Sequence, residues 1–190
     1  MSAPPLEGRR IVITRARAQA AGLADRLAAL GAEVIEFPTI EIQPPADPRS
    51  LDRAAASVSE YDWIIFTSAN GVRAFMERSP DFSAFAGRIC AIGPATCRAA
   101  EAAGLRVDIV PEEYVAESLV AAFASEEIAG KRILLPRAAV ARDVVPGELR
   151  ARGARVDVVE AYRTVVPESA PALARQIFGA DRKPDWITFT

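Results

Sequence analysis

The chain has 190 residues, of which 51% are hydrophobic, and this is enough to form one large core or two small ones. Its 23 basic and 25 acidic residues nearly balance, which argues against a nucleic-acid partner. The sequence contains no histidine, so catalytic triads and zinc sites that need one are excluded. No apolar run approaches the length of a membrane span, and the first ten residues lack the apolar stretch of a signal peptide. We therefore expect a cytoplasmic protein with no membrane partner.

Cysteine and acidic residues give no sign of a cofactor. Cys90 lies in an apolar strand pattern and Cys97 in an alanine-rich helix pattern, as is typical of reduced cysteines that serve packing. No acidic cluster has the spacing of metal ligands. We expect neither a metal nor another cofactor.

Short apolar runs rich in β-branched residues alternate with alanine- and leucine-rich segments along the chain. The expected strands are residues 9–15, 32–37, 63–68, 88–93, 106–111 and 131–137. The expected helices are residues 18–30, 51–59, 70–78, 95–104 and 116–124. This alternation predicts an α/β fold with parallel sheets and helices on both faces.

Three segments recur after about the same number of residues. Residues 8–18 resemble residues 130–140, the helix ending at Gly31 resembles the one ending at Gly153, and DWIIFT resembles the final DWITFT. Because all three keep nearly the same register, we interpret them as a tandem duplication of one α/β module. The first copy continues into a turn and a helix where the chain ends, so we expect the second copy to be incomplete.

Two turns at expected strand ends carry small polar residues. FTSANG places Thr67 and Ser68 before a helix, and AIGPAT places Gly93 and Thr96 in the same way. Backbone N–H groups at a helix start, with small hydroxyls beside them, can hold a carboxylate or phosphate. A simple helix cap explains each turn as well, and neither turn matches a Walker A or GxGxxG phosphate loop. Both interpretations stay open.

Two arginines and a tyrosine also follow expected strands. Arg15 and Arg137 occupy equivalent positions in the two copies, at strand ends where open α/β sheets bind ligands. Since arginine binds carboxylates bidentately, we expect both to face one anionic ligand, with solvated surface charge as the alternative. Tyr162, in VEAYRTV, is either a core-edge residue or part of the same site.

The order and spacing of these motifs resemble those of the uroporphyrinogen-III synthase family over the whole chain. The resemblance is carried by IVITR, LAALGAEVIEFPTIEI, DWIIFTSANGV, AIGPATCRAAEAAG, LLPRA, VVPGELRARGARVDVVEAYRT and DWITFT. It implies two similar flavodoxin-like parallel-sheet domains joined by a two-stranded connector. Domain one would comprise residues 1–36 and 167–190, without its C-terminal part. The connector strands would lie in residues 37–50 and 160–166, and domain two would be residues 51–159.

The resemblance further implies a cyclising hydro-lyase of tetrapyrrole (haem) biosynthesis, monomeric when complete. Its substrate would be hydroxymethylbilane, closed to uroporphyrinogen III with loss of water, inversion of the last pyrrole ring and no cofactor. By matched position, Tyr162 would be catalytic, hydrogen-bonding or protonating the departing hydroxyl. The expected substrate-binding residues are Arg15, Thr67, Ser68, Gly93, Thr96, Arg137 and Thr190. The incomplete second copy leaves open whether this chain is active or an inactive fragment.

Two other classes share parts of this pattern. A two-lobed α/β protein that binds or senses a small ligand without catalysis would also be duplicated, but usually carries a signal peptide or a DNA-reading helix pair. A flavodoxin-like receiver module would need clustered acidic residues after its first strand, where this sequence has Thr14 and Arg15.

Overall fold

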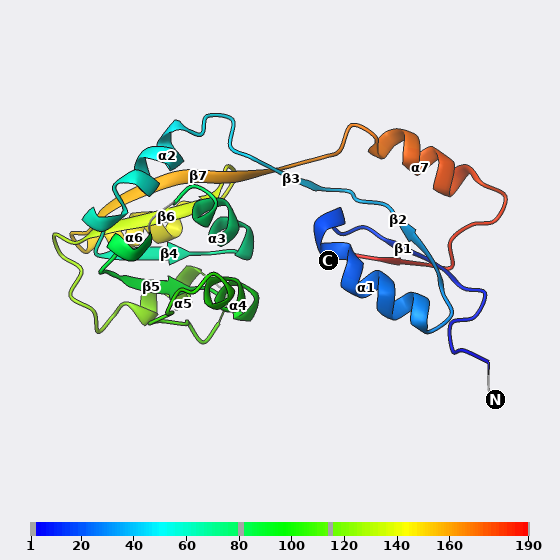
Figure 1. Ribbon diagram of the computed structural model, residues 1–190, viewed down its shortest axis with the longest axis horizontal. Coiled ribbons are helices and arrows are strands. Elements are labelled where there is room, and N and C mark those ends of the chain that lie inside the picture. The colour runs from blue at the N-terminus through cyan, green and yellow to red at the C-terminus, as the bar shows by residue number, and fades with distance from the viewer. Residues whose placement is uncertain (1–2, 80–81, 114–115, 190) are drawn as a thin grey trace. The chain divides into compact units, whose positions relative to one another are not determined.

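The computed structural model describes residues 3–79, 82–113 and 116–189 of the chain (Figure 1). The chain divides into two compact units, one of residues 1–43 with 164–190 and the other of residues 44–163. Each unit contains its own mainly parallel sheet with helices packed against it. The α/β class predicted from the alternating pattern is confirmed.

The first unit holds a three-stranded parallel sheet in the order β2-β1-β8. The strands are β1 (Arg10–Ile13), β2 (Glu33–Glu36) and β8 (Trp186–Thr188), and the helices are α1 (Arg17–Ala29) and α7 (Ala170–Gly179). The β-branched run Ile11–Ile13 is buried at the centre of this sheet, as its apolar character requires.

A five-stranded sheet in the order β3-β7-β6-β4-β5 forms the centre of the second unit, and its edge strand β3 is made of the residues that directly precede this unit. The strands are β3 (Glu41–Gln43), β4 (Trp63–Phe66), β5 (Arg88–Ala91), β6 (Arg132–Ala138) and β7 (Arg155–Val165). The helices are α2 (Arg49–Ala56), α3 (Ala69–Met76), α4 (Pro94–Ala102), α5 (Ala116–Ala122) and α6 (Val144–Ala151), with short 3-10 turns at Val58–Glu60 and Phe82–Ala84. The β4–β5, β4–β6 and β6–β7 pairs are all parallel.

Side chains alternate between two cores on opposite faces of the five-stranded sheet. Ile64, Phe66 and Leu134 join a core built with α2, α3 and α4, which we call the α3-side core. Ile65 and Leu135 join a second core built with α5 and α6, which we call the α6-side core. This period of two along buried strands, with helices over both faces, is what a parallel sheet needs.

The duplication is visible in the strand pairing. The order β2-β1-β8 in the first unit corresponds to β7-β6-β4 in the second. Equivalent aspartates fix the register in both: Asp185 accepts from the backbone N–H of Arg10 at 2.8 Å, and Asp62 accepts from that of Arg132 at 2.8 Å. In the described residues, β8 pairs with β1 alone, whereas β4 lies between two strands. Because β8 is an edge strand there, Trp186 is 52% exposed, whereas its counterpart Trp63 on β4 is only 4% exposed.

Two predicted strands are shorter than expected. The strand expected at residues 106–111 reduces to a bridge between Cys90 and Ile109, because the Asp108 carboxylate accepts the Ile89 N–H at 2.9 Å in place of a ladder carbonyl. The strand expected within residues 37–50 is only β3, since Pro38 lacks an N–H group for a ladder bond. The segment 160–166 is no separate strand, because residues 160–165 continue β7.

Candidate functional site

The carboxyl ends of the parallel strands gather most of the expected site residues of the second unit along one edge. Following the strand order, Tyr162 lies on β7, Arg137 on β6, Thr67 and Ser68 after β4, and Gly93 after β5. We call this row the carboxyl edge. Open α/β sheets bind their ligands beyond this edge, so the sequence-based hypothesis places these residues in a suitable location.

Ser68 is the N-cap of α3. Its Oγ accepts a hydrogen bond from the backbone N–H of Gly71 at 3.0 Å, so the capping interpretation is confirmed. A Cβ atom at Gly71 would lie 3.1 Å from the carbonyl oxygen of Pro136. Glycine therefore lets the start of α3 approach the end of β6 closely.

Gly93 forms the turn from β5 into α4. Its backbone has φ 80° and ψ 158°, a conformation open almost only to glycine, and Pro94 follows as the first helical residue. The preceding residue, Ile92, donates its N–H to the carbonyl of Phe66 at 2.9 Å and so ties this turn to the end of β4. Thr96 is buried, so its side chain belongs to the inner surface of α4 rather than to the exposed part of the turn.

A β-bulge sets the direction of Tyr162. Arg137 pairs with Glu160, but Ala138 pairs with Tyr162, so β7 carries one extra residue, Ala161. Regular alternation would direct Ala161 and Tyr162 to opposite faces, yet Ala161 is buried in the α3-side core and Tyr162 packs against the same core. The bulge thus brings the tyrosine, half-buried, to the face of the sheet that α3 covers.

Arg137 lies on the other face and has partners within its own loop. Its Nη1 donates to the carbonyl of Arg142 at 2.9 Å, and its Nη2 forms an ion pair with Asp143, while only 14% of the side chain is exposed. The following residue, Ala138, pairs with Tyr162, so alternation places the arginine opposite the tyrosine. The structure brings Arg137 to the carboxyl edge but directs it into the loop of residues 138–143.

The first unit holds the remaining expected site residues. Arg15 is half-buried two residues after the end of β1, and the intervening Thr14 donates from Oγ to the carbonyl of Thr188 at 2.6 Å. Arg15 therefore follows the carboxyl end of the central strand of its own sheet. Thr190, also expected in the site, lies outside the described residues.

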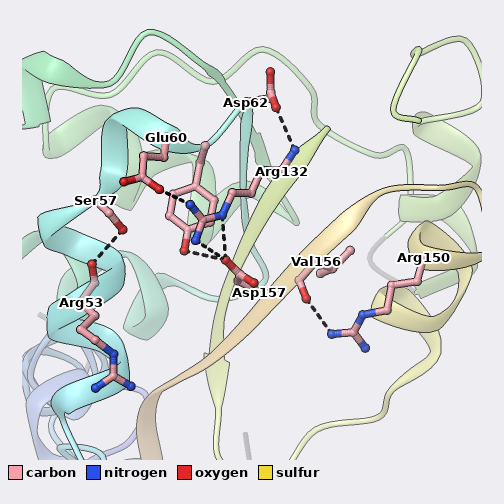
Figure 2. A network of polar contacts seen from close by, with 9 residues as sticks. Arg53, Ser57, Glu60, Asp62, Arg132, Arg150, Val156 and Asp157 are labelled. Atoms are coloured by element: carbon pink, nitrogen blue, oxygen red, sulfur yellow. Dashed lines mark hydrogen bonds and ion pairs between the residues drawn. The ribbon is translucent and has the colours of Figure 1, made fainter. Parts of the chain in front are cut away.

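The most developed polar network lies at the opposite, amino end of the five-stranded sheet. Figure 2 shows Arg132, the first residue of β6, pairing with Glu60 and with Asp157, the latter at 2.9 Å. Tyr61 donates from its hydroxyl to Asp157 at 2.9 Å, and its ring lies 4.5 Å from the Arg132 guanidinium carbon. Burial and then the Asp157 carboxylate raise the pKa of Tyr61 to about 12. Each charged group has a partner, so this network stabilises the start of the strands.

Sequence reasoning missed Gly71, Asp143 and the bulge at Ala161. Gly71 has a weak signal, a glycine early in an expected helix, which is typical of close backbone approach. The bulge could not be predicted from the pattern of apolar residues, because Ala161 and Tyr162 are both residue types that occur at the edge of a core. Asp143 looks like an ordinary helix cap and gains its partner only through folding.

The described residues hold neither a metal-binding cluster nor a helix suited to a membrane. In this part of the chain, no three histidine, cysteine, aspartate or glutamate side chains come together as ligands. Likewise, no helix here combines the length and apolar character that a bilayer crossing demands.

A doubly wound parallel sheet with polar turns along its carboxyl edge defines an α/β protein of the kind that binds a small ligand at strand ends. A family model described as uroporphyrinogen-III synthase HemD matches residues 21–190. The chain belongs to this uroporphyrinogen-III synthase family, and the resemblance inferred from the sequence is confirmed.

Known proteins support the same assignment. The uroporphyrinogen-III synthase of Synechococcus elongatus is 38% identical over 176 residues, covering 90% of this chain and 66% of that protein. A putative uroporphyrinogen-III synthase of Methanothermobacter thermautotrophicus is 36% identical over 184 residues, covering 95% and 72%. This chain therefore spans about two thirds of the length of these relatives.

Solved structures agree at the level of the fold. A mutant uroporphyrinogen III synthase from Thermus thermophilus superposes with a TM-score of 0.61 at 19% identity, covering 96% of this chain and 93% of that one. The enzyme from Helicobacter pylori gives a TM-score of 0.55 at 15% identity, covering 93% and 69%. The α/β fold with mainly parallel sheets is thus shared with these proteins.

Proposed function

We propose that this chain carries uroporphyrinogen-III synthase activity in porphyrin biosynthesis. It would close hydroxymethylbilane to uroporphyrinogen III, inverting the last pyrrole ring and releasing one water molecule. The observation that carries the proposal is the family match over residues 21–190, reinforced by the polar residues along the carboxyl edge. A two-lobed binding protein without catalysis is not favoured by this match.

We also propose the domain division that the repeat indicates. Residues 51–159 would form one flavodoxin-like domain, residues 1–36 with 167–190 would belong to the other, and residues 37–50 and 160–166 would connect them. The separation of the chain into two compact units, with boundaries near residues 43 and 163, supports this proposal.

The substrate carboxylates would bind at the helix starts and the arginine of the repeat. The Thr67–Ser68 turn before α3 and the Gly93 turn before α4 lie beside each other because β4 and β5 are neighbours. Two helix N-termini at one edge present partial positive charge to an anion. By its repeat position, Arg15, which follows β1 in the first unit, is also assigned to the binding of a substrate carboxylate.

Tyr162 would act on the departing hydroxyl. Its phenolic O–H can donate a hydrogen bond or a proton as the C–O bond breaks and water leaves. When the free α-carbon of the inverted pyrrole forms its new bond to the neighbouring ring, it loses its proton, and this proton restores the phenol. The bulge at Ala161 supports this assignment, since bulges commonly re-aim a side chain next to an active site.

The preference for isomer III over isomer I would result because the protein holds the flexible substrate in one conformation. Hydroxymethylbilane also closes without an enzyme, giving the uninverted isomer I. Orientation of a bound chain supplies several kcal/mol of preference, enough to direct closure to isomer III.

The direct test is turnover by this 190-residue chain. The protein is incubated with freshly prepared hydroxymethylbilane, and isomers III and I are resolved by chromatography. Isomer III above the protein-free control is expected. A folded chain that yields isomer I alone, at the control rate, would refute the proposal for this chain.

A further inference from the structure

The loop of residues 138–143, which runs from the last residue of β6 to the N-cap of α6, is held at both ends by residues of the carboxyl edge. At its start, the N–H of Ala139 donates to the carbonyl of Tyr162 at 2.9 Å. At its end, Arg137 donates to the carbonyl of Arg142 at 2.9 Å and pairs with Asp143. One arginine side chain therefore joins the last residue of the loop to the strand from which the loop begins.

The Asp143 carboxylate binds Arg137 and does not cap the helix that it precedes. It occupies the N-cap position of α6, where an aspartate normally accepts from the backbone N–H groups of the first turn. No such side-chain cap bond forms, and only its carbonyl joins the helix, accepting from Gly147 at 3.1 Å. Its carboxylate is instead directed at Arg137.

The middle of the loop presents an apolar side chain to solvent. Val140 is 93% exposed, and the helix that follows begins with Val144, which is also exposed. An isolated exposed valine needs no explanation. This one lies one residue from Ala139, whose backbone bonds Tyr162, so it belongs to the edge where the substrate would bind.

We propose that Arg137 is a positioning residue: it holds the loop of residues 138–143 in place, so that Val140 forms an apolar contact with a pyrrole ring of the substrate. This proposal rests on the proposed function. It assigns to Arg137 an indirect role, because its guanidinium is largely covered, lies on the face opposite Tyr162, and already has two acceptors. The apolar face of a pyrrole matches the valine better than any charged group of the substrate does.

The first measurement needs no substrate. Amide hydrogen exchange over residues 139–143 is compared for the unsubstituted chain, Arg137→Gln, Asp143→Asn and the double variant. Both single variants should raise exchange in this loop, Arg137→Gln more than Asp143→Asn because it also loses the bond to the Arg142 carbonyl. The double variant should match Arg137→Gln, because the ion pair is lost in either single change. If amide hydrogen exchange in the loop were unchanged in Arg137→Gln, the proposal that Arg137 holds the loop in place would be refuted.

The second measurement separates positioning from direct substrate contact. If Arg137 acts through the loop, Arg137→Gln lowers the yield of isomer III relative to isomer I about tenfold, Asp143→Asn lowers it by less, and the double variant matches Arg137→Gln. Arg137→Lys, which keeps the charge but lacks the planar fork, should behave like Arg137→Gln. If Arg137 instead binds a substrate carboxylate, Asp143→Asn leaves isomer III unchanged or raises it, and the proposal fails.

Val140 is tested with a matched control. Val140→Ser should lower the isomer ratio without changing loop exchange, whereas Val166→Ser, at a valine that is 70% exposed in the other unit, should change neither. Equal isomer ratios in both variants would overturn the apolar contact. If the unsubstituted chain neither forms isomer III nor binds uroporphyrinogen III in equilibrium dialysis, the proposed function and the contact with substrate both fail. In that case the amide hydrogen exchange measurements still decide whether Arg137 holds the loop in place.

Discussion

Replacing Tyr61 by phenylalanine should make the chain less sensitive to alkali. The hydroxyl of Tyr61 donates to Asp157, the ring is 5% exposed, and the folded-state pKa is about 12 against an ordinary 10.0. A raised pKa contributes stability that is complete below pH 10 and is lost as the pH rises towards 12, since only the unfolded chain then ionises freely. Linkage with these two values gives a loss on the order of 1 kcal/mol between pH 8 and pH 11.

Urea unfolding of both proteins at pH 8 and pH 11 measures this effect. At pH 8 the unsubstituted chain should be more stable by about 1.5 kcal/mol, the size of a hydrogen bond to a charged acceptor. At pH 11 the two proteins should have nearly equal free energies of unfolding. Tyr162→Phe serves as the control, because it leaves Tyr61 in place and should keep the alkaline loss. If the unsubstituted chain were more stable than Tyr61→Phe by the same amount at both pH values, the assignment of the shift to this hydroxyl would be refuted.

Two further predictions concern the register and the turns. In Asp62→Asn, the free energy of unfolding should fall less steeply as the pH is lowered. The Arg132 backbone N–H, and then Lys131, lower the pKa of Asp62 in the folded chain. The stability that this carboxylate contributes is therefore present above the ordinary pKa near 3.8 and disappears as the pH falls through the folded-state pKa. Urea midpoints from pH 6 to pH 2.5 measure this, and an unchanged acid limb would contradict it. Gly93→Ala should cost about 1–3 kcal/mol in thermal unfolding and also lower isomer III, because φ 80° with ψ 158° suits only glycine. Gly104→Ala is the control, because Gly104 also has a positive φ of 79° but has open space around it; this variant should lose stability and still form isomer III. Equal yields of isomer III from both variants would contradict a role of the Gly93 turn in substrate binding.

Periodicity predicted the parallel sheets because buried strands such as Trp63–Phe66 are continuous apolar runs and the helices between them end at glycines. It overestimated the strand near Asp108, since apolar letters do not reveal that a side chain will replace a ladder carbonyl. The turns at Ser68 and Gly93 were predictable from local chemistry. The partners of the arginine and tyrosine were not, because they depend on how β6 and β7 align.

Arg137 shows the limit of the repeat as a guide. The duplication predicted it as the counterpart of Arg15, and both lie at the carboxyl end of the central strand of a sheet, Arg15 just beyond β1 and Arg137 near the end of β6. Position in a repeat fixes the backbone, but the direction of a long side chain depends on the nearest acceptors. For Arg137 these are the Arg142 carbonyl and Asp143, which are supplied by the following loop.

Tyr162→Phe tests whether the bulge in β7 serves catalysis. If the hydroxyl protonates the leaving group, its removal should reduce the rate of isomer III formation about a hundredfold or more, while the free energy of unfolding changes little because the ring stays in place. Tyr61→Phe is the matched control, since it removes a hydroxyl at the far edge of the same sheet and should leave the rate at pH 7 unchanged. A Tyr162→Phe protein with full rate would show that closure is directed by positioning alone. The extra residue Ala161 would then serve only to continue the α3-side core along β7.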